Sequence, residues 1–488
     1  MKHSARLADS LDVDTACVAT PEIVEPLEPC KHLPPHDLFP LPLTAFEKFM
    51  LVDDHRDYPR TYTVLLELTG QLHQAAFETA MGEVIQRNPL LSAIVRKCHS
   101  RWHWTAVVFP SDEVRWGEPV TESGSLRIDL RKQPGFRVSG TTDGVNSEIR
   151  FTFHHAVCDG RGARRVILDW LTAYAAIMAP EQKHVRFDQL DYERLRRRGE
   201  FTRTPPRPKT ELVPAEPVTL MQRIRTIYQF LSQHPTPLRT STKLPRLRGR
   251  GPIEILSFRF SRSEVAQFRD RLRGSRIRLN DVAIAILLNS IAKWNRSHGE
   301  SGSDRLYRIL VPVDLREPSD QFLPAANRLS FVFITRHTSL CLDWPSLLAT
   351  IRAEMDYIEE HGSQYNLVNA LPVIQSVPGI VGAAVKIPIC FSTAVLTNLG
   401  DTFRGVRRRF PEENGRPVIG NLQFVRAGGA PPIRPKTRLG IGLTISLGEL
   451  VVQSQFDSQT FSPEDAAEFM RQFAANWQNW GNSTPEYR

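Results

Sequence analysis

A change of hydrophobic period between Ile149 and Tyr174 is the feature that most constrains the fold. Apolar residues first alternate with polar ones through Ile149, Phe151 and Phe153, which is typical of a half-buried strand. After Gly160 they return every three or four positions, as on one face of a helix, at Ala163, Val166, Ile167, Trp170, Leu171 and Tyr174. A strand that leads through a short loop into an amphipathic helix indicates an α/β domain.

The loop between these two elements carries the adjacent histidines His154 and His155, in the stretch HHAVCDG. Strand alternation places His155 on the apolar face and His154 on the other. A titratable ring that points inward from a strand end is a candidate general base, and a structural buried histidine is the alternative. Zinc binding fits less well, because the pair lacks the i, i+4 spacing of helical zinc motifs, so we expect no metal. Nothing around Cys158 predicts an activated thiolate.

The order of predicted elements divides the 488 residues into four parts. Residues 1–40 are proline-rich and aperiodic, which predicts a poorly ordered arm. Strands and helices alternate in residues 41–185 and again in residues 251–488, which predicts two α/β subdomains. Residues 186–250 are rich in proline and arginine, as expected of a linker.

Capping signals predict where several helices begin. Thr44 with Glu47, and Ser261 with Glu264, form the spacing of a capping box. We expect Asn280 to cap the strongly apolar helix that follows it.

The charge balance is basic, with 62 Lys and Arg against 53 Asp and Glu. Two arginine-rich clusters, Arg194–Arg198 and Arg404–Arg409, contribute to it. Neither lies in a recognisable nucleic-acid module, so we expect no nucleic-acid partner. An anionic cofactor, an acidic partner protein or anionic lipid would equally explain the charge. Scattered cysteines and a polar N-terminal stretch lead us to expect a cytoplasmic protein with free thiols.

Two apolar stretches predict either packing between subdomains or contact with lipid. The first, Ala370–Phe391, is interrupted by prolines and Lys386, so it fails as a membrane-spanning helix. The second is an amphipathic helix predicted at Leu220–Leu231 in the linker. If they meet lipid, we expect weak peripheral membrane contact, helped by both arginine clusters.

HHAVCDG resembles the HHxxxDG motif of the acyl-thioester-dependent acyltransferases, a superfamily that includes chloramphenicol acetyltransferase, condensation domains, alcohol acetyltransferases and wax ester synthase/diacylglycerol acyltransferases. Other stretches resemble the superfamily in the same order: RNPLLSAIV, RLNDVAIAILLNSIAKW, VPVDLR with the downstream Asn327, and LTNLGD. The resemblance covers roughly Leu41–Phe473. The DFGWG motif of the plant branch is missing from the sequence, which weakens a match to that branch.

The resemblance implies two chloramphenicol-acetyltransferase-like subdomains, with mixed sheets flanked by helices and an active-site tunnel between them. It implies that His155 is the general base, with His154 beside it. It also implies that Asp159 pairs with an arginine, for which we choose Arg316, and that Gly160 permits close approach of substrate or backbone.

We therefore expect an acyltransferase that moves an acyl group from coenzyme A, or from the phosphopantetheine of an acyl carrier protein, to a hydrophobic alcohol. Both donors would be co-substrates, and we expect no bound cofactor. Thr397 and Asn398 are candidate oxyanion donors. The alternatives are condensation-type amide formation on an amine acceptor, and a non-catalytic protein that binds a carrier or lipid.

Overall fold

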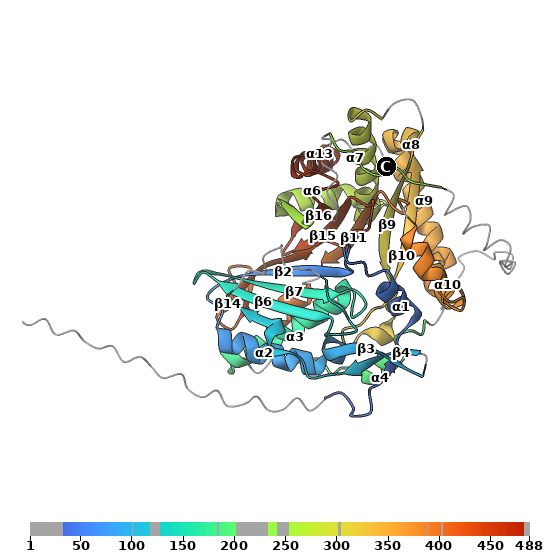
Figure 1. Cartoon of the computed structure of the whole chain (residues 1–488). Helices are drawn as coiled ribbons and strands as arrows, with labels where there is room; N and C mark the ends of the chain where they lie inside the picture. Colours follow the sequence, from blue (N-terminus) through green and yellow to red (C-terminus); the bar gives the residue numbers. More distant parts are fainter. Residues whose placement is uncertain are drawn as a thin grey trace, which may run out of the picture. The chain divides into compact units, whose positions relative to one another are not determined.

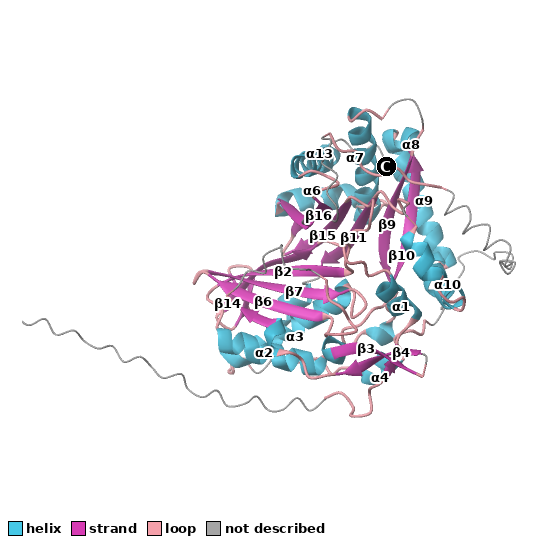
Figure 2. Cartoon of the chain, viewed as in Figure 1, coloured by secondary structure: helices cyan, strands magenta, loops and turns pink. Residues whose placement is uncertain are grey.

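The computed structural model describes residues 33–99, 101–117, 127–182, 185–201, 233–241, 253–300, 304–387, 389–401 and 404–482. Most of the predicted arm and the predicted helix Leu220–Leu231 lie outside these residues. Within them, mixed sheets are flanked by helices, as predicted (Figures 1 and 2).

The first large sheet is mostly antiparallel and has the motif strand β7 near its middle. In spatial order its strands are β12 (Glu412–Glu413), β13 (Arg416–Ile419), β14 (Leu422–Gly429), β2 (Thr61–Thr69), β7 (Asn146–His154), β6 (Phe136–Thr142) and β5 (Val114–Trp116). A small sheet beside it contains β1 (Leu41–Pro42), β4 (Arg101–Ala106) and β3 (Ala93–Cys98).

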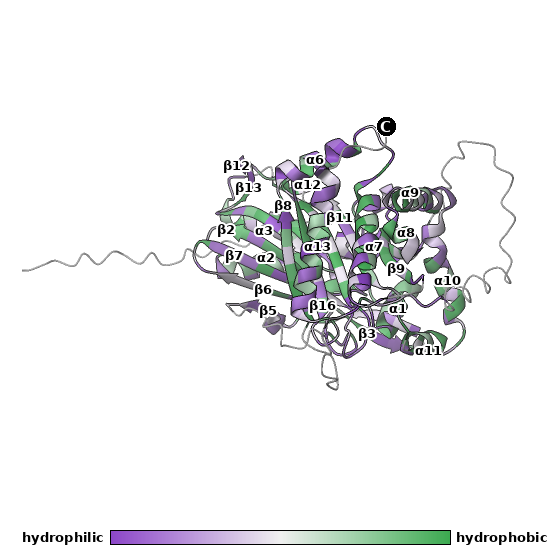
Figure 3. Cartoon of the chain, turned by 90° about the horizontal axis from the view of Figure 1, so that it is seen from above, coloured by the Kyte–Doolittle hydropathy of each residue, from purple (hydrophilic) through white to green (hydrophobic). Residues whose placement is uncertain are grey.

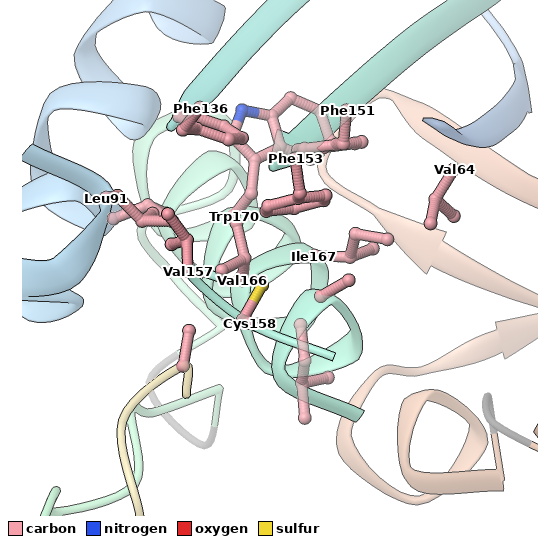
Figure 4. Close-up of a cluster of buried hydrophobic side chains, with 14 of the residues drawn as sticks. Val64, Leu91, Phe136, Phe151, Phe153, Val157, Cys158, Val166, Ile167 and Trp170 are labelled. Carbon is pink, nitrogen blue, oxygen red and sulfur yellow. The ribbon is translucent and has the colours of Figure 1, made fainter. Parts of the chain in front are cut away.

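Helices α2 (Gln74–Arg87) and α3 (Gly160–Met178) pack together against the first sheet. The alternation predicted for β7 is present, because Ile149, Phe151 and Phe153 are fully buried. Their face meets the apolar stripe of α3, including Trp170, in the cluster shown in Figure 4. This packing orients the start of α3 next to the end of β7.

The second large sheet has the order β10 (Leu329–His337), β9 (Leu306–Asp314), β11 (Ala394–Asp401), β15 (Leu439–Ser446), β16 (Glu449–Asp457) and β8 (Ile253–Phe260). Strands β9, β11 and β15 run parallel, and the outer pairings are antiparallel. The helices packed around it are α6 (Arg262–Leu272), α7 (Leu279–Ser297), α8 (Thr338–Leu342), α9 (Trp344–His361) and α13 (Pro463–Asn482).

The remaining described helices are short: α1 (Ala45–Val52), α4 (Tyr192–Arg196), α10 (Asn366–Gln375), α11 (Ile380–Lys386) and α12 (Arg404–Arg409). Helices α10 and α11 carry extended apolar stretches (Figure 3). Among the described helices, no single one is long and apolar enough to cross a membrane. One pair, Ser363–Gln375 with Ile380–Lys386, meets the length and composition criteria together but is bent by 118°.

Strand β14 belongs to the second half of the sequence, yet it pairs with β2 in the first sheet. The backbone of its last residue, Gly429, lies so close to Gly442 of β15 that a Cβ at position 442 would overlap the Gly429 carbonyl oxygen. The two halves of the chain are therefore interleaved at this junction. The residue boundaries of the two subdomains stay a proposal.

The capping boxes predicted at Thr44 and Ser261 are both present. The prediction for Asn280 was wrong, because α7 already begins at Leu279 and its N-cap is Arg278. Asp281 supplies the cap hydrogen bond instead, since its carboxylate accepts from the Arg278 backbone N–H at 2.8 Å.

Only part of the cluster Arg194–Arg198 can present its charge to a lipid surface, because Arg197 is exposed and Arg196 half-buried, whereas the other two arginines are buried. Arg194 and Arg198 are 7% and 1% exposed. Arg194 donates to Asp320 at 2.6 Å, and Arg198 donates to Glu47 at 2.7 Å. Buried arginines of this kind pair with carboxylates, because an unpaired buried charge is costly.

Candidate active site

The HHAVCDG loop is short and held at both ends by backbone structure. Strand β7 ends at His154, and α3 begins at Gly160. Asp159 caps α3, since its Oδ1 accepts from the backbone N–H groups of Arg161 at 3.0 Å and Gly162 at 2.9 Å. The cap therefore fixes the position of the loop relative to the helix.

The predicted ion pair between Asp159 and Arg316 is present. The Arg316 guanidinium donates two hydrogen bonds to the carboxylate, at 2.8 and 2.9 Å, and the Arg328 backbone N–H adds a third at 2.7 Å. Burial alone would raise the pKa of Asp159, but the Arg316 charge and these donors hold that pKa below its ordinary value. Asp159 thus joins the motif loop to the segment after β9 and is fully engaged there.

His155 lies at the start of the loop with its backbone fixed on both sides. Its N–H donates to the Arg60 carbonyl at 2.6 Å, and the Asn327 side-chain amide donates to its carbonyl. Its ring lies 5.0 Å from that of Tyr62, which stacks on Phe153 at 5.5 Å. His155 therefore shares the side of Phe153, as the strand alternation predicted.

His154 faces the other way and is fully buried. Its Nδ1 accepts from the Ala156 backbone N–H at 3.1 Å, and its Nε2 lies 3.8 Å from Asp54 Oδ1. Burial lowers the pKa of His154 to about 3. Because its ring is neutral and enclosed, His154 is poorly placed to reach a substrate.

Burial also lowers the pKa of His155, although its ring is only partly buried. The Asp159 charge and the histidine's own backbone oppose this shift, and the Arg60 charge adds to it. Its Nδ1 is buried, with no hydrogen-bond partner from another described residue. The ring is therefore uncharged at neutral pH, which is the state a base requires.

A charged cluster around His154 was missed in the sequence. Asp53 binds Arg60 at 2.5 Å and Arg434 at 2.8 Å, and Asp54 accepts from Arg127 at 3.2 Å. These five residues come from three separate segments of the chain. The only local signal was two consecutive carboxylates after an apolar helix, which is too common to identify such a cluster.

The start of α3 lies unusually close to the loop that carries Asn327. A Cβ on Gly162 would be 3.0 Å from the Ala326 carbonyl oxygen and 2.6 Å from Cys158 Cβ. Asn88 supports the same loop, since its side chain accepts from the Ala325 N–H at 2.9 Å. These contacts place Asn327 where it can reach His155.

The segment with Thr397 and Asn398 is next to the motif, as an oxyanion site would require. A register shift in β11 lies between Asn398 and Gly400, and a Cβ on Gly160 would be 2.7 Å from Cδ2 of the intervening Leu399. The group that approaches Gly160 here is therefore a side chain. Asn398 Oδ1 already accepts from the Gly400 N–H at 2.9 Å. The described contacts include no hydrogen bond from Thr397 or Asn398 to His155, so their role stays a prediction.

The geometry does not favour Cys158 as a nucleophile. Its thiol is fully buried, and burial raises its pKa far above the ordinary value, so the thiol stays protonated. The Tyr62 hydroxyl donates to its carbonyl oxygen at 3.1 Å. In the described part of the chain, no three His, Cys, Asp or Glu side chains gather as a metal-ligand set.

Comparisons with known proteins show which solved structures have a similar fold. No protein-family model matches the sequence, and a search of curated proteins finds no match. Among solved structures, the chain is similar to TRI3 trichothecene 15-O-acetyltransferase from Fusarium sporotrichioides, with a TM-score of 0.65, 12% identity, and coverage of 94% of this chain and 99% of that one.

Two domains of peptide synthetases are also similar. The epimerization domain of tyrocidine synthetase B aligns with a TM-score of 0.58 and 14% identity, over 91% of this chain and 97% of that one. The starter condensation domain of rhizomide synthetase, solved with C8-CoA and Leu-SNAC, aligns with a TM-score of 0.56 and 11% identity, over 91% and 95%.

The chain therefore has the fold shared by condensation domains and chloramphenicol-acetyltransferase-like acyltransferases. This confirms the predicted fold class. The predicted tunnel and the roles of the site residues stay predictions.

Proposed function

We propose that this protein is an acyltransferase in which His155 is the general base. The observation that carries the proposal is the contrast between the two histidines. His155 is partly accessible and uncharged, whereas His154 is enclosed. The donor is an acyl thioester of coenzyme A or of a carrier-protein phosphopantetheine, and the acceptor is a hydrophobic alcohol.

In the proposed reaction, His155 Nε2 takes the proton of the acceptor hydroxyl as its oxygen attacks the thioester carbonyl. The new C–O bond gives a tetrahedral oxyanion. Its collapse breaks the C–S bond, and the departing thiolate takes the proton back from His155. No acyl-enzyme is needed, and a base of this kind contributes about 10²–10⁴-fold in rate.

The surroundings of His155 support this role. Its Nδ1 is buried, so Nε2 is the ring nitrogen proposed to accept the proton. Asp159, bound by Arg316 and by the start of α3, would act as a structural anchor of the loop. Thr397 and Asn398 are the proposed hydrogen-bond donors to the oxyanion.

O-acylation is the first choice because the similar TRI3 enzyme is an O-acetyltransferase. Amide formation on an amine acceptor is the alternative, supported by similarity to the rhizomide condensation domain. A protein that only binds a carrier or lipid is the third candidate. The intact set of His155, Asp159 and Arg316 argues against it.

Substitution of the two histidines tests the proposal. Purified wild-type protein, His155→Ala and His154→Ala are incubated with a panel of acyl-CoAs and with alcohol or amine acceptors, and products are detected by mass spectrometry. We expect His155→Ala to lose at least 100-fold in rate while keeping its fold, and His154→Ala to lose less. Equal losses in two well-folded variants would refute the assignment.

Lipid contact is a separate part of the proposal. Val373, Val377, Ile380 and Ile387 on and beside α10 and α11 are 42–62% exposed, and they would meet an acyl chain or a bilayer surface. Vesicle flotation measures this. We expect weak binding to anionic vesicles that fades with salt, because the charges of the exposed arginines Arg197, Arg404 and Arg408 are screened over about 10 Å at 0.1 M. No binding at low salt would refute lipid contact.

A further inference from the structure

Seven arginines lie on two elements next to the motif: Arg161, Arg164 and Arg165 at the start of α3, and Arg404, Arg407, Arg408 and Arg409 in α12. The elements touch there, because a Cβ on Gly405 would be 3.0 Å from the Arg164 guanidinium. Figure 3 shows the positions of α3 and α12. We call this set the α3–α12 basic cluster.

Four of these arginines are neutralised by carboxylates. Arg161 binds Asp314 at 3.0 Å, Arg409 binds Asp188 at 2.7 Å, Arg165 binds the same Asp188, and Arg407 binds Glu412 at 2.9 Å. In each case the charge is satisfied within the protein.

Arg164, Arg404 and Arg408 differ from the others. Within the described residues none of them forms an ion pair or a hydrogen bond. Arg404 and Arg408 are exposed, so water solvates them, but Arg164 is partly buried. Burial and the neighbouring charges of Arg161 and Arg165 lower the pKa of Arg164, and the charge of Asp401 offsets this only in part.

Half-burying a guanidinium among other arginines is unfavourable unless an anion joins them. The position also matters, because Arg164 lies one helical turn after Gly160, about 6 Å along α3. The cluster is therefore at the edge of the motif loop. An arginine fork matches the oxygen geometry of a phosphate group especially well.

We propose that the α3–α12 basic cluster, with Arg164 at its centre, binds a phosphate group of the acyl donor. This rests on the proposed function, which supplies a thioester donor with a phosphorylated pantetheine arm. The phosphate belongs either to coenzyme A or to the phosphopantetheine of a carrier protein. The arm separates the phosphate from the thioester, so we expect the phosphate site to lie beside the reaction centre and not in it.

Binding without turnover tests the proposal. Calorimetry measures the dissociation constants of coenzyme A, 4′-phosphopantetheine and pantetheine for wild type, Arg164→Gln and Arg164→Lys. The control is Arg273→Gln, which removes an exposed arginine paired with Asp270 on α6 and so matches the change of charge. Thermal unfolding verifies that each variant is folded.

We expect Arg164→Gln to weaken coenzyme A binding about tenfold to a hundredfold, since a charged hydrogen bond contributes roughly 1.5–3 kcal/mol. Arg164→Lys should recover part of this, and pantetheine binding and the Arg273→Gln control should be unchanged. If Arg164→Gln weakens the binding of both 4′-phosphopantetheine and coenzyme A, the arginine binds the phosphate that both donors share. If it weakens only the binding of coenzyme A, the arginine binds a phosphate of the nucleotide part.

Unchanged coenzyme A affinity in Arg164→Gln, or an equal loss for pantetheine, would overturn the proposal. If His155 is required for ester formation but the affinity for coenzyme A is the same in Arg164→Gln, only the phosphate site is refuted. If coenzyme A binds through Arg164 but no acyl transfer occurs with any acceptor, the proposed function fails and the phosphate site stands.

Discussion

At the residue scale, the adjacent histidines His154 and His155 differ in chemistry because their rings lie in different environments. His154 and His155 follow one another in a strand end, so their side chains point to opposite sides. One ring contacts Asp54 in an enclosed cluster, and the other packs on Tyr62 beside the motif loop. Their different accessibility follows from this geometry.

The pH dependence of activity is a direct consequence for His155. A general base works only when neutral, and burial lowers the pKa of His155 below the ordinary 6.5. We therefore expect kcat/KM to stay level through neutral pH and to fall only below pH 6.5, as the ring gains its proton. A pH–rate profile measures this. An acidic limb that begins above pH 6.5 would contradict it.

Stability should respond to His154. Its pKa is about 3 in the folded state and near 6.5 when unfolded, so the unfolded state binds the proton first as pH falls. The contribution of His154 to the free energy of unfolding is fully present above pH 6.5. It is lost as the pH falls toward 3, by at most about 1.4 kcal/mol per pH unit.

Urea unfolding of wild type and His154→Gln between pH 7 and 4 measures this contribution. We expect the variant to lose stability less steeply with falling pH, because it lacks the buried imidazole. Parallel curves for the two proteins would show that His154 does not carry the effect.

At the element scale, close backbone approach positions the motif. Helix α3 can lie against the Ala326 backbone only because position 162 has no side chain. The Asp159 cap and the Arg316 ion pair act at the same helix start. The location of the loop is therefore a property of how α3 packs.

Gly162→Ala tests this packing. Its Cβ would meet Cys158 and the Ala326 backbone, so we expect a loss of about 1–3 kcal/mol in the free energy of unfolding and a fall in activity. Gly82→Ala in α2 is the matched control, since nothing lies within 4 Å of its Cβ position. It should stabilise by about 0.5–1 kcal/mol. If the urea midpoints of Gly162→Ala and Gly82→Ala shift in the same direction, the close packing at position 162 does not explain the effect.

At the scale of the whole molecule, the two halves of the chain share a sheet. Strand β14 pairs with β2, whose other neighbour is β7. The Asp159–Arg316 pair crosses between the halves at the motif. The site is therefore assembled only when both halves fold together.

Expression of fragments tests this interdependence. Residues 33–201 alone would keep the pairing of β2 with β7 but lose β14, which leaves β2 as an exposed edge strand and favours aggregation. We expect this fragment to be aggregated or unfolded in size-exclusion chromatography and circular dichroism, and co-expression with residues 233–482 to recover soluble complex. A monomeric, cooperatively folded fragment would refute this view.

Local pattern in the sequence was sufficient for the elements around the motif. Alternation predicted β7 and the side of His155, and the caps at Thr44 and Ser261 predicted two helix starts. These features depend on residues a few positions apart, so the sequence contains the whole interaction. The pairing of Asp159 with Arg316 could be predicted only through the resemblance to a family.

Tertiary structure alone decided the rest, because the partners are far apart in the chain. Nothing local predicts that β14 joins β2, or that Arg198 is buried against Glu47, 151 residues away. Nor does any local period place Leu399 on Gly160. Such contacts depend on which surfaces meet when the sheets and helices pack, so the sequence determined the motif and its strand, whereas packing decided its surroundings.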